Sequence, residues 1–144
     1  MEFQRRHSNQ VTGNMGLYYV CYRLSRMGWN VMPTSRNARG IDILIYNQDA
    51  SQTHTIQVKA LSKRNAVGLG TKREGVLGDF FIICRNFASD NPECFVLKPA
   101  EVRKLAHSSG NGSKTQYWLE PKQYEAFKFK EKWEQIGRGA AVDF

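Results

Sequence analysis

Three polar residues on two neighbouring predicted strands carry the chemistry that this sequence suggests. Asp42 stands at the start of a strand predicted for residues 41–46, and Gln57 and Lys59 lie on a strand predicted for residues 53–60. Because side chains alternate along a strand, Gln57 and Lys59 share one face. A hairpin that pairs the two strands can bring Asp42 beside them. The sequence thus predicts a carboxylate, an amide oxygen and an ammonium group at one end of a sheet.

These three groups suit the hydrolysis of a phosphate ester. A carboxylate and an amide oxygen can hold a hard cation such as Mg²⁺, which takes few protein ligands and retains several waters. A nearby Lys can orient or help to deprotonate a water and stabilise the charge that develops on a phosphate. Each residue also has an ordinary interpretation, because an Asp at a strand start is often a turn residue and a QxK pattern is often a solvated strand face.

A helix predicted for residues 14–27 precedes these strands. Thr12 or Asn14 can cap its N-terminus, and Gly28 stands where a left-handed C-terminal cap is expected. Apolar residues recur at spacings of three and four and predict a buried stripe that consists of Leu17, Val20, Cys21, Leu24 and Met27.

The remaining elements predict a fold of the α/β or α+β class. Further strands are predicted at residues 29–32, 79–85, 94–98 and 116–120, and further helices at 99–107 and 121–137. Residues 61–78 show no periodicity and are predicted to form a long, partly mobile loop, and loops of that length in compact domains are usually functional. The order of elements indicates a mixed central sheet flanked by helices.

Length and composition limit the class of protein. The 144 residues, 41% of them hydrophobic, predict one domain over residues 1–144 and exclude a disordered chain. No apolar run approaches the roughly 20 residues that span a bilayer, and the N-terminal segment lacks the apolar core of a secretory signal. The three cysteines lack CxxC spacing, so we expect reduced thiols in a cytoplasmic protein and no zinc site.

The helix, the segment GIDILIY, a turn and the segment TIQVKA together resemble the core of the PD-(D/E)xK nucleases. The resemblance covers residues 12–61 and is nearest to the Holliday-junction-resolvase-like and Mrr-like groups. It implies a restriction-endonuclease-like αβββαβ core. It also implies that Asp42 is the first metal-binding acid, that Gln57 and the carbonyl of Val58 are further metal ligands, and that Lys59 is the catalytic lysine. The implied cofactor is Mg²⁺ or Mn²⁺, the implied substrate is duplex or branched DNA, and the implied assembly is a homodimer.

Two departures from the family pattern bear on activity. Gln57 replaces the usual Glu, a variant that the Mrr-like groups use. Leu17 follows Gly16, where many resolvase-like members carry a Glu, so Asp42 is the single carboxylate of the motif unless Asp79 compensates. Two other classes therefore stay open beside an endonuclease. One is a catalytically inactive nuclease fold that binds nucleic acid, and the other is a protein-interaction module of the accessory or immunity type.

Positive charge is concentrated in the half of the chain that holds the motif. The net charge of +8 divides into eleven basic and four acidic residues over residues 1–78, and ten and nine over residues 79–144. Such a surplus attracts polyanions. Guanidinium groups match phosphate oxygens, and a basic segment after the motif can cover a substrate groove. The predicted nucleic-acid contacts are Arg36, Asn37, Arg39, Lys63, Arg64, Lys72 and Arg73.

Both groups of predicted contacts have a plain alternative. Asn37 and Gly40 can form a turn between solvated arginines, and the segment after the motif can be a solvated loop. Tyr18, Tyr19 and Tyr22 on the first helix could stack on bases, but core packing or a dimer surface is the more usual role for such residues.

Overall fold

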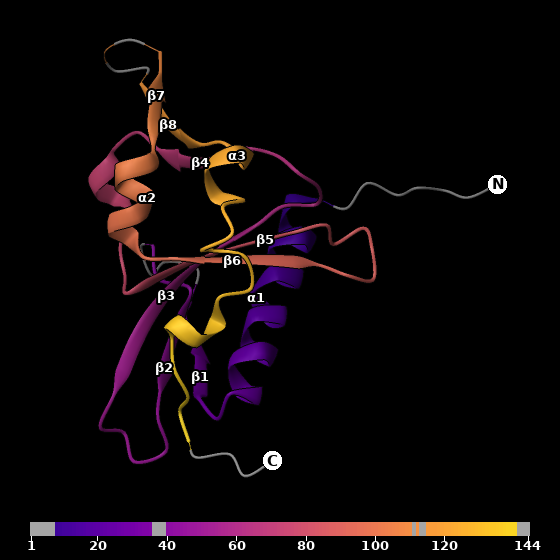
Figure 1. The fold of residues 1–144 in the computed structure, drawn as a ribbon, viewed down its shortest axis with the longest axis vertical. Helices are drawn as coiled ribbons and strands as arrows, with labels where there is room; N and C mark the ends of the chain where they lie inside the picture. Colours follow the sequence, from indigo (N-terminus) through magenta and orange to yellow (C-terminus); the bar gives the residue numbers. More distant parts are fainter. Residues whose placement is uncertain (1–7, 36–39, 111, 113–114, 141–144) are drawn as a thin grey trace, which may run out of the picture.

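A five-stranded sheet runs through the centre of the molecule in the order β1-β2-β3-β5-β6 (Figure 1). The computed structural model describes residues 8–35, 40–110, 112 and 115–140. Neighbouring strands are antiparallel except for β3 and β5, which are parallel. The predicted fold class, α+β with a mixed central sheet flanked by helices, is confirmed. The strands are Asn30–Pro33 (β1), Ile43–Tyr46 (β2), Thr53–Ala60 (β3), Phe80–Arg85 (β5) and Glu93–Leu97 (β6).

One face of this sheet is covered by α1, Asn9–Arg26. The helix begins earlier than predicted because Ser8 is its N-cap and accepts a hydrogen bond from the Val11 amide. The predicted caps at Thr12 and Asn14 are therefore wrong, since both residues lie inside the helix. The C-terminal prediction is confirmed, because Gly28 follows the helix with a φ of +90°.

The buried stripe of α1 packs on the central sheet as predicted. Val20, Cys21 and Leu24 are buried against the strand residues of this face, and Leu17 and Met27 pack at its margin. The closest approach is at Gly16, where an added Cβ would lie 2.4 Å from the Cβ of Ala60 on β3. The helix can therefore lie this close to β3 only with a glycine at position 16.

The opposite face is covered by a second sheet of three antiparallel strands in the order β4-β8-β7, together with α2. The predicted loop over residues 61–78 is thus wrong in part, because it contains β4 and a 3₁₀ turn, η1. A glycine-rich strand such as β4 has a weak local signal, and its partner β8 lies far along the chain. The elements are Val67–Gly70 (β4), Arg73–Gly75 (η1), Pro99–Leu105 (α2), His107–Ser109 (β7) and Gln116–Leu119 (β8).

The predicted helix over residues 121–137 is also wrong. It is replaced by the short helix α3, Pro121–Tyr124, and the 3₁₀ turn η3, Trp133–Gln135. Between them Phe129 is 1% exposed whereas Phe127 is 85% exposed. Residues 127–129 form a turn in which the Phe129 amide donates to the carbonyl of Ala126 (2.9 Å), and Lys130 forms a bridge with Phe95 of β6. No helix in the described ranges is long and apolar enough to cross a membrane.

Candidate active site

The candidate site lies in a notch beside the first residue of β2, where β3 continues beyond its pairing with β2. Ile43 at the start of β2 pairs with Ile56, whereas β3 runs on beside β5 to Ala60. Over residues 57–60 no described strand pairs with β3 on its β2 side. Asp42, the residue just before β2, occupies this notch.

Asp42 contacts β3 on both sides of Gln57. Its amide donates to the carbonyl of Ile56 (2.9 Å), and its carboxylate Oδ2 accepts a hydrogen bond from the amide of Val58 (2.7 Å). The second bond involves an ionised acceptor, which makes it stronger than an ordinary backbone bond. The amide and carbonyl of one strand residue point to the same side of the strand. The carbonyl of Val58 therefore points toward the side on which Asp42 lies.

Gln57 and Lys59 share the other face of β3, away from α1, as predicted. Their partners on the parallel strand β5 are Phe81 and Ile83, which belong to the core beneath the second sheet. The side-chain oxygen of Gln57 is buried and accepts no hydrogen bond from any described residue. A buried acceptor without a partner costs about 1–3 kcal/mol. Such an atom calls for a water or an ion beside it.

These oxygens match the preference of a hard cation. A carboxylate, an amide oxygen and a main-chain carbonyl are the ligand types that Mg²⁺ and Mn²⁺ take, with water completing the shell. They come from Asp42, Gln57 and Val58, the three residues that the sequence motif implies. The residues present therefore fit a divalent cation with a small number of protein ligands.

Among the described residues, Asp42 supplies the carboxylate of this notch. Within the described ranges no group of three or more His, Cys, Asp and Glu residues is arranged to hold a metal ion. Asp79 accepts hydrogen bonds from the amide (2.9 Å) and hydroxyl (3.2 Å) of Thr55, so its carboxylate fixes the start of β5 to β3. Leu17 packs against the core on the α1 side and offers no oxygen.

The predicted nucleic-acid contacts fall into two groups. Arg36, Asn37 and Arg39 lie outside the described residues. Lys63 and Lys72 are exposed and form no ion pair within the described part of the chain.

The two arginines that accompany these lysines contact the protein itself. Arg64 pairs with Glu125 through Nη2 and Oε2 (3.3 Å), and the guanidinium of Arg73 lies 5.3 Å from the ring of Tyr117. Arg64 and Arg73 therefore anchor this segment to α3 and β8.

Glu125 is a residue that sequence reasoning missed. It accepts hydrogen bonds from Arg64 and from Arg85, the buried arginine at the end of β5. These two guanidinium groups lower the pKa of the Glu125 carboxyl to about 2. The signal in the sequence is Arg85 itself, since a charged residue that ends a wholly apolar strand needs a buried partner.

The fold is similar to that of a solved structure. A bacterial homing endonuclease superposes with a TM-score of 0.60 at 17% sequence identity, over 90% of this chain and 93% of that one. The fold is nuclease-like. No protein-family model matches the sequence, and no curated protein sequence matches it. At 17% identity the similarity concerns the path of the chain, so the activity has to be argued from the notch at Asp42.

Proposed function

We propose that this protein is a metal-dependent endonuclease that cleaves DNA phosphodiester bonds and that its catalytic residues are Asp42, Gln57 and Lys59. The observation that supports it is the carboxylate of Asp42, which accepts a hydrogen bond from the Val58 amide beside Gln57, whose buried side-chain oxygen has no hydrogen-bond partner among the described residues. The nuclease-like fold and the surplus of positive charge in the same half of the chain favour DNA as the substrate.

Mg²⁺ or Mn²⁺ would be held by Asp42, by the side-chain oxygen of Gln57 and by the carbonyl of Val58. When bound, the cation supplies a positive charge that polarises the scissile phosphate. Lys59 places its ammonium group on the same face of β3 as Gln57, where it holds the attacking water and stabilises negative charge on the phosphate oxygens. The water oxygen forms a bond to phosphorus and gives up a proton to solvent as the bond to the leaving oxygen breaks, and the leaving oxygen takes up a proton from solvent.

The test is cleavage of duplex, branched and single-stranded DNA with Mg²⁺ or Mn²⁺ by the wild type, Asp42→Ala, Lys59→Ala and Lys104→Ala. Lys104 is an exposed lysine on α2 and serves as the charge-matched control. We expect Asp42→Ala and Lys59→Ala to lower the rate by about 100-fold or more and Lys104→Ala to leave it unchanged. Cleavage that survives both site variants, with folding verified by circular dichroism, would overturn the proposal.

A second candidate is a catalytically inactive nuclease fold that binds nucleic acid or another protein. The single carboxylate in the notch favours it, because metal affinity falls with the number of charged ligands. Measuring DNA binding beside cleavage on the same substrates separates the two. Wild-type protein that binds DNA and cleaves it with neither cation indicates the inactive nucleic-acid-binding protein, and absence of both binding and cleavage indicates the protein-interaction module.

A further inference from the structure

Thr34 holds the main chain on both sides of the Asp42 α-carbon. Its amide donates to the carbonyl of Asp42 (2.9 Å), and its hydroxyl donates to the carbonyl of Ile41 (2.5 Å). Thr34 directly follows Pro33, the last residue of β1, which has no amide hydrogen to donate. The pairing of β1 with β2 therefore continues past Pro33 and Ile43 through two hydrogen bonds that Thr34 supplies.

Asp42 is bonded to a different neighbour on each side. Its amide donates to the carbonyl of Ile56 on β3 (2.9 Å), whereas its carbonyl accepts the hydrogen bond from the Thr34 amide. In a regular strand the amide and carbonyl of one residue point to the same side. Asp42 departs from this pattern, so the chain turns at its α-carbon, between β3 and Thr34. The direction of the Asp42 side chain therefore depends on the bonds on both sides.

The Asp42 carboxylate has one oxygen bonded to the protein and one available to a ligand. Oδ2 accepts the hydrogen bond from the Val58 amide (2.7 Å), and Oδ1 accepts none from a described residue. Val58 lies beyond the residues of β3 that pair with β2, so this bond requires the Asp42 α-carbon to stay beside β3. A shift of the α-carbon would move Oδ1 relative to the buried oxygen of Gln57.

The Thr34 hydroxyl also joins the chain before and after residues 35–40. The side chain of Ile41 is held separately, because a Cβ added to Gly78 would lie 3.2 Å from its Cδ1 atom and 3.2 Å from the carbonyl of Thr55. Loss of the Thr34 hydroxyl would thus release the carbonyl of Ile41 and leave its side-chain packing in place. We therefore expect a variant without this hydroxyl to fold.

We infer that Thr34 is a positioning residue of the candidate active site. Its hydroxyl holds the peptide between Ile41 and Asp42, which keeps Oδ2 of Asp42 on the Val58 amide and Oδ1 placed for a divalent cation. The inference rests on the proposed function, since it names the residue that orients a proposed metal ligand. A displacement of about 1 Å in a preorganised site can lower the rate roughly 100-fold. One hydrogen bond behind Asp42 can therefore control the rate of cleavage.

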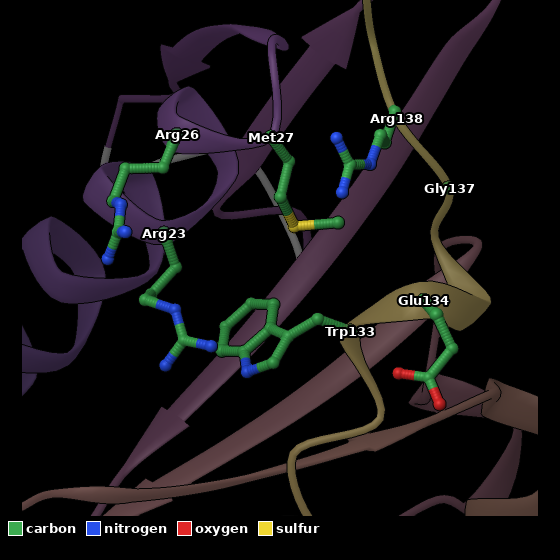
Figure 2. A pocket seen from close by; sticks show the side chains of 7 residues that line it. All are labelled: Arg23, Arg26, Met27, Trp133, Glu134, Gly137 and Arg138. Carbon is green, nitrogen blue, oxygen red and sulfur yellow. The ribbon is translucent and has the colours of Figure 1, made fainter. Parts of the chain in front are cut away.

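Two hydrogen bonds of the same kind lie outside the notch and supply matched controls. Nε2 of Gln48 donates to the carbonyl of Gly28 (2.8 Å), beyond the other end of β2. At that end of the sheet the C-terminal segment passes the end of α1, beside a cavity of about 500 Å³ (Figure 2). The hydroxyl of Thr115 donates to the carbonyl of Gly112 (2.8 Å), before β8. Each bond joins a side-chain donor to a main-chain carbonyl, like the hydroxyl bond of Thr34.

The test compares variants of the full chain, each checked for folding by circular dichroism. Thr34→Val keeps the branched side chain and removes the hydroxyl, whereas Thr34→Ser retains a hydroxyl. Asp42→Ala sets the values for complete loss, and Gln48→Met and Thr115→Val are the controls. The first measurement is hydrogen exchange of the Val58 amide without metal, followed by nuclear magnetic resonance. The second is the Kd for Mn²⁺, measured by electron paramagnetic resonance of the free ion, and the third is cleavage of duplex DNA at saturating Mn²⁺.

We expect Thr34→Val to speed exchange of the Val58 amide at least 10-fold, toward the rate in Asp42→Ala. Its Kd for Mn²⁺ should rise about 10-fold, and its kcat at saturating Mn²⁺ should fall by roughly 10- to 100-fold. Its KM for DNA should change less than two-fold, because Thr34 contacts Asp42 and not the substrate. Thr34→Ser should restore all three values to within about three-fold of the wild type. The two controls should match the wild type in every measurement.

Three results would count against these proposals, and they can be told apart. Thr34→Val with wild-type Val58 exchange and wild-type Mn²⁺ affinity would overturn the inference, while cleavage by the wild type would leave the proposed function intact. Failure of Thr34→Ser to restore the values would also overturn the inference, because the loss would then come from altered packing. Wild-type protein that binds no Mn²⁺ and cleaves no DNA would overturn the proposed function together with the metal-placing role of Thr34.

Discussion

The carboxylate of Asp42 accepts its one described hydrogen bond from the backbone amide of Val58, at 2.7 Å. This bond lies beside the start of β2, where β3 runs on past Ile56, so a side chain covers a strand edge next to which no described strand lies. The negative charge is thereby fixed beside Gln57, whose side-chain oxygen is buried and has no partner in the part of the chain that the structure describes. Because the Asp42 charge lies beside the Gln57 oxygen, we expect metal binding and stability to respond to a substitution at position 57.

Gln57→Glu should tighten metal binding and weaken the metal-free fold. A second carboxylate adds charge to the ligand set, so we expect the Kd for Mn²⁺ to fall about 10-fold. Without metal, two carboxylates in a partly buried notch repel each other, so the melting temperature should drop by several degrees. Titration of the melting temperature with Mn²⁺ measures both effects. Gln116→Glu, at an exposed position on β8, should show neither, and an unchanged Mn²⁺ response in Gln57→Glu would remove Gln57 from the ligand set.

Gly16→Ala should destabilise the protein although alanine is the better helix former. The added Cβ would lie 2.4 Å from the Cβ of Ala60, which forces α1 away from β3. We expect the free energy of unfolding in urea to fall by about 1–3 kcal/mol.

Gly13→Ala provides the matched control in the same helix. An added Cβ there meets no atom within 4 Å, so the substitution should raise stability by up to about 1 kcal/mol. Equal effects of the two substitutions would show that α1 does not approach β3 at position 16.

Glu125→Gln should lower stability at neutral pH and flatten its dependence on acid. Because Arg64 and Arg85 depress the pKa of Glu125 to about 2, its stabilisation is complete above its ordinary value near 4.5 and is lost as the pH falls through about 2. Removing the charge also leaves buried Arg85 without its strongest partner. We expect a loss of about 2 kcal/mol at pH 7 that shrinks between pH 5 and pH 2.

Chemical denaturation at several pH values measures this difference. Glu134→Gln is the control, since that carboxylate is 70% exposed and lies 4.0 Å from Lys132. An exposed pair at this distance contributes little, so its variant should follow the wild type across the range. A pH-independent difference for Glu125→Gln would contradict the assignment.

Phe129→Ala and Phe127→Ala should differ sharply. Phe129 is 1% exposed in the core beneath the second sheet, so its truncation should cost about 3–5 kcal/mol. Phe127 is 85% exposed and should tolerate alanine within about 0.5 kcal/mol. Thermal unfolding of the two variants checks that the turn at residues 127–129 buries Phe129 and exposes Phe127, and similar losses would contradict this path of the chain.

Local patterns predicted the strand that carries Gln57 and Lys59 better than they predicted the elements around it. The strand over residues 53–60 has the predicted bounds, and alternation correctly placed Gln57 and Lys59 on one face. These inferences rest on neighbours within a few residues, where period and turn signals are strong. The hydrogen bond from the Val58 amide to Asp42 could not be predicted from the sequence, because it depends on the residue at which β2 begins to pair with β3.

Pairings between distant segments could not be predicted in the same way. β4 has two glycines among its four residues and becomes a strand only because it pairs with β8. The residues after α3 have an apolar spacing that suits a helix, yet the carboxylate of Glu131 accepts a hydrogen bond from the Cys94 amide and the Glu131 amide donates to the Cys94 carbonyl, so this segment is held beside β6 instead. In both places a contact far along the chain decides the local structure.

The same pairing pattern sets an expected order of assembly. β1, β2 and β3 follow one another and pair as neighbours, so closing them requires only short loops. The second sheet forms only after β4 pairs with β8, and these two strands are far apart in the sequence. Asp42 and Gln57 thus belong to a meander that we expect to form early and to exchange its amide hydrogens slowly, whereas the second sheet should open first.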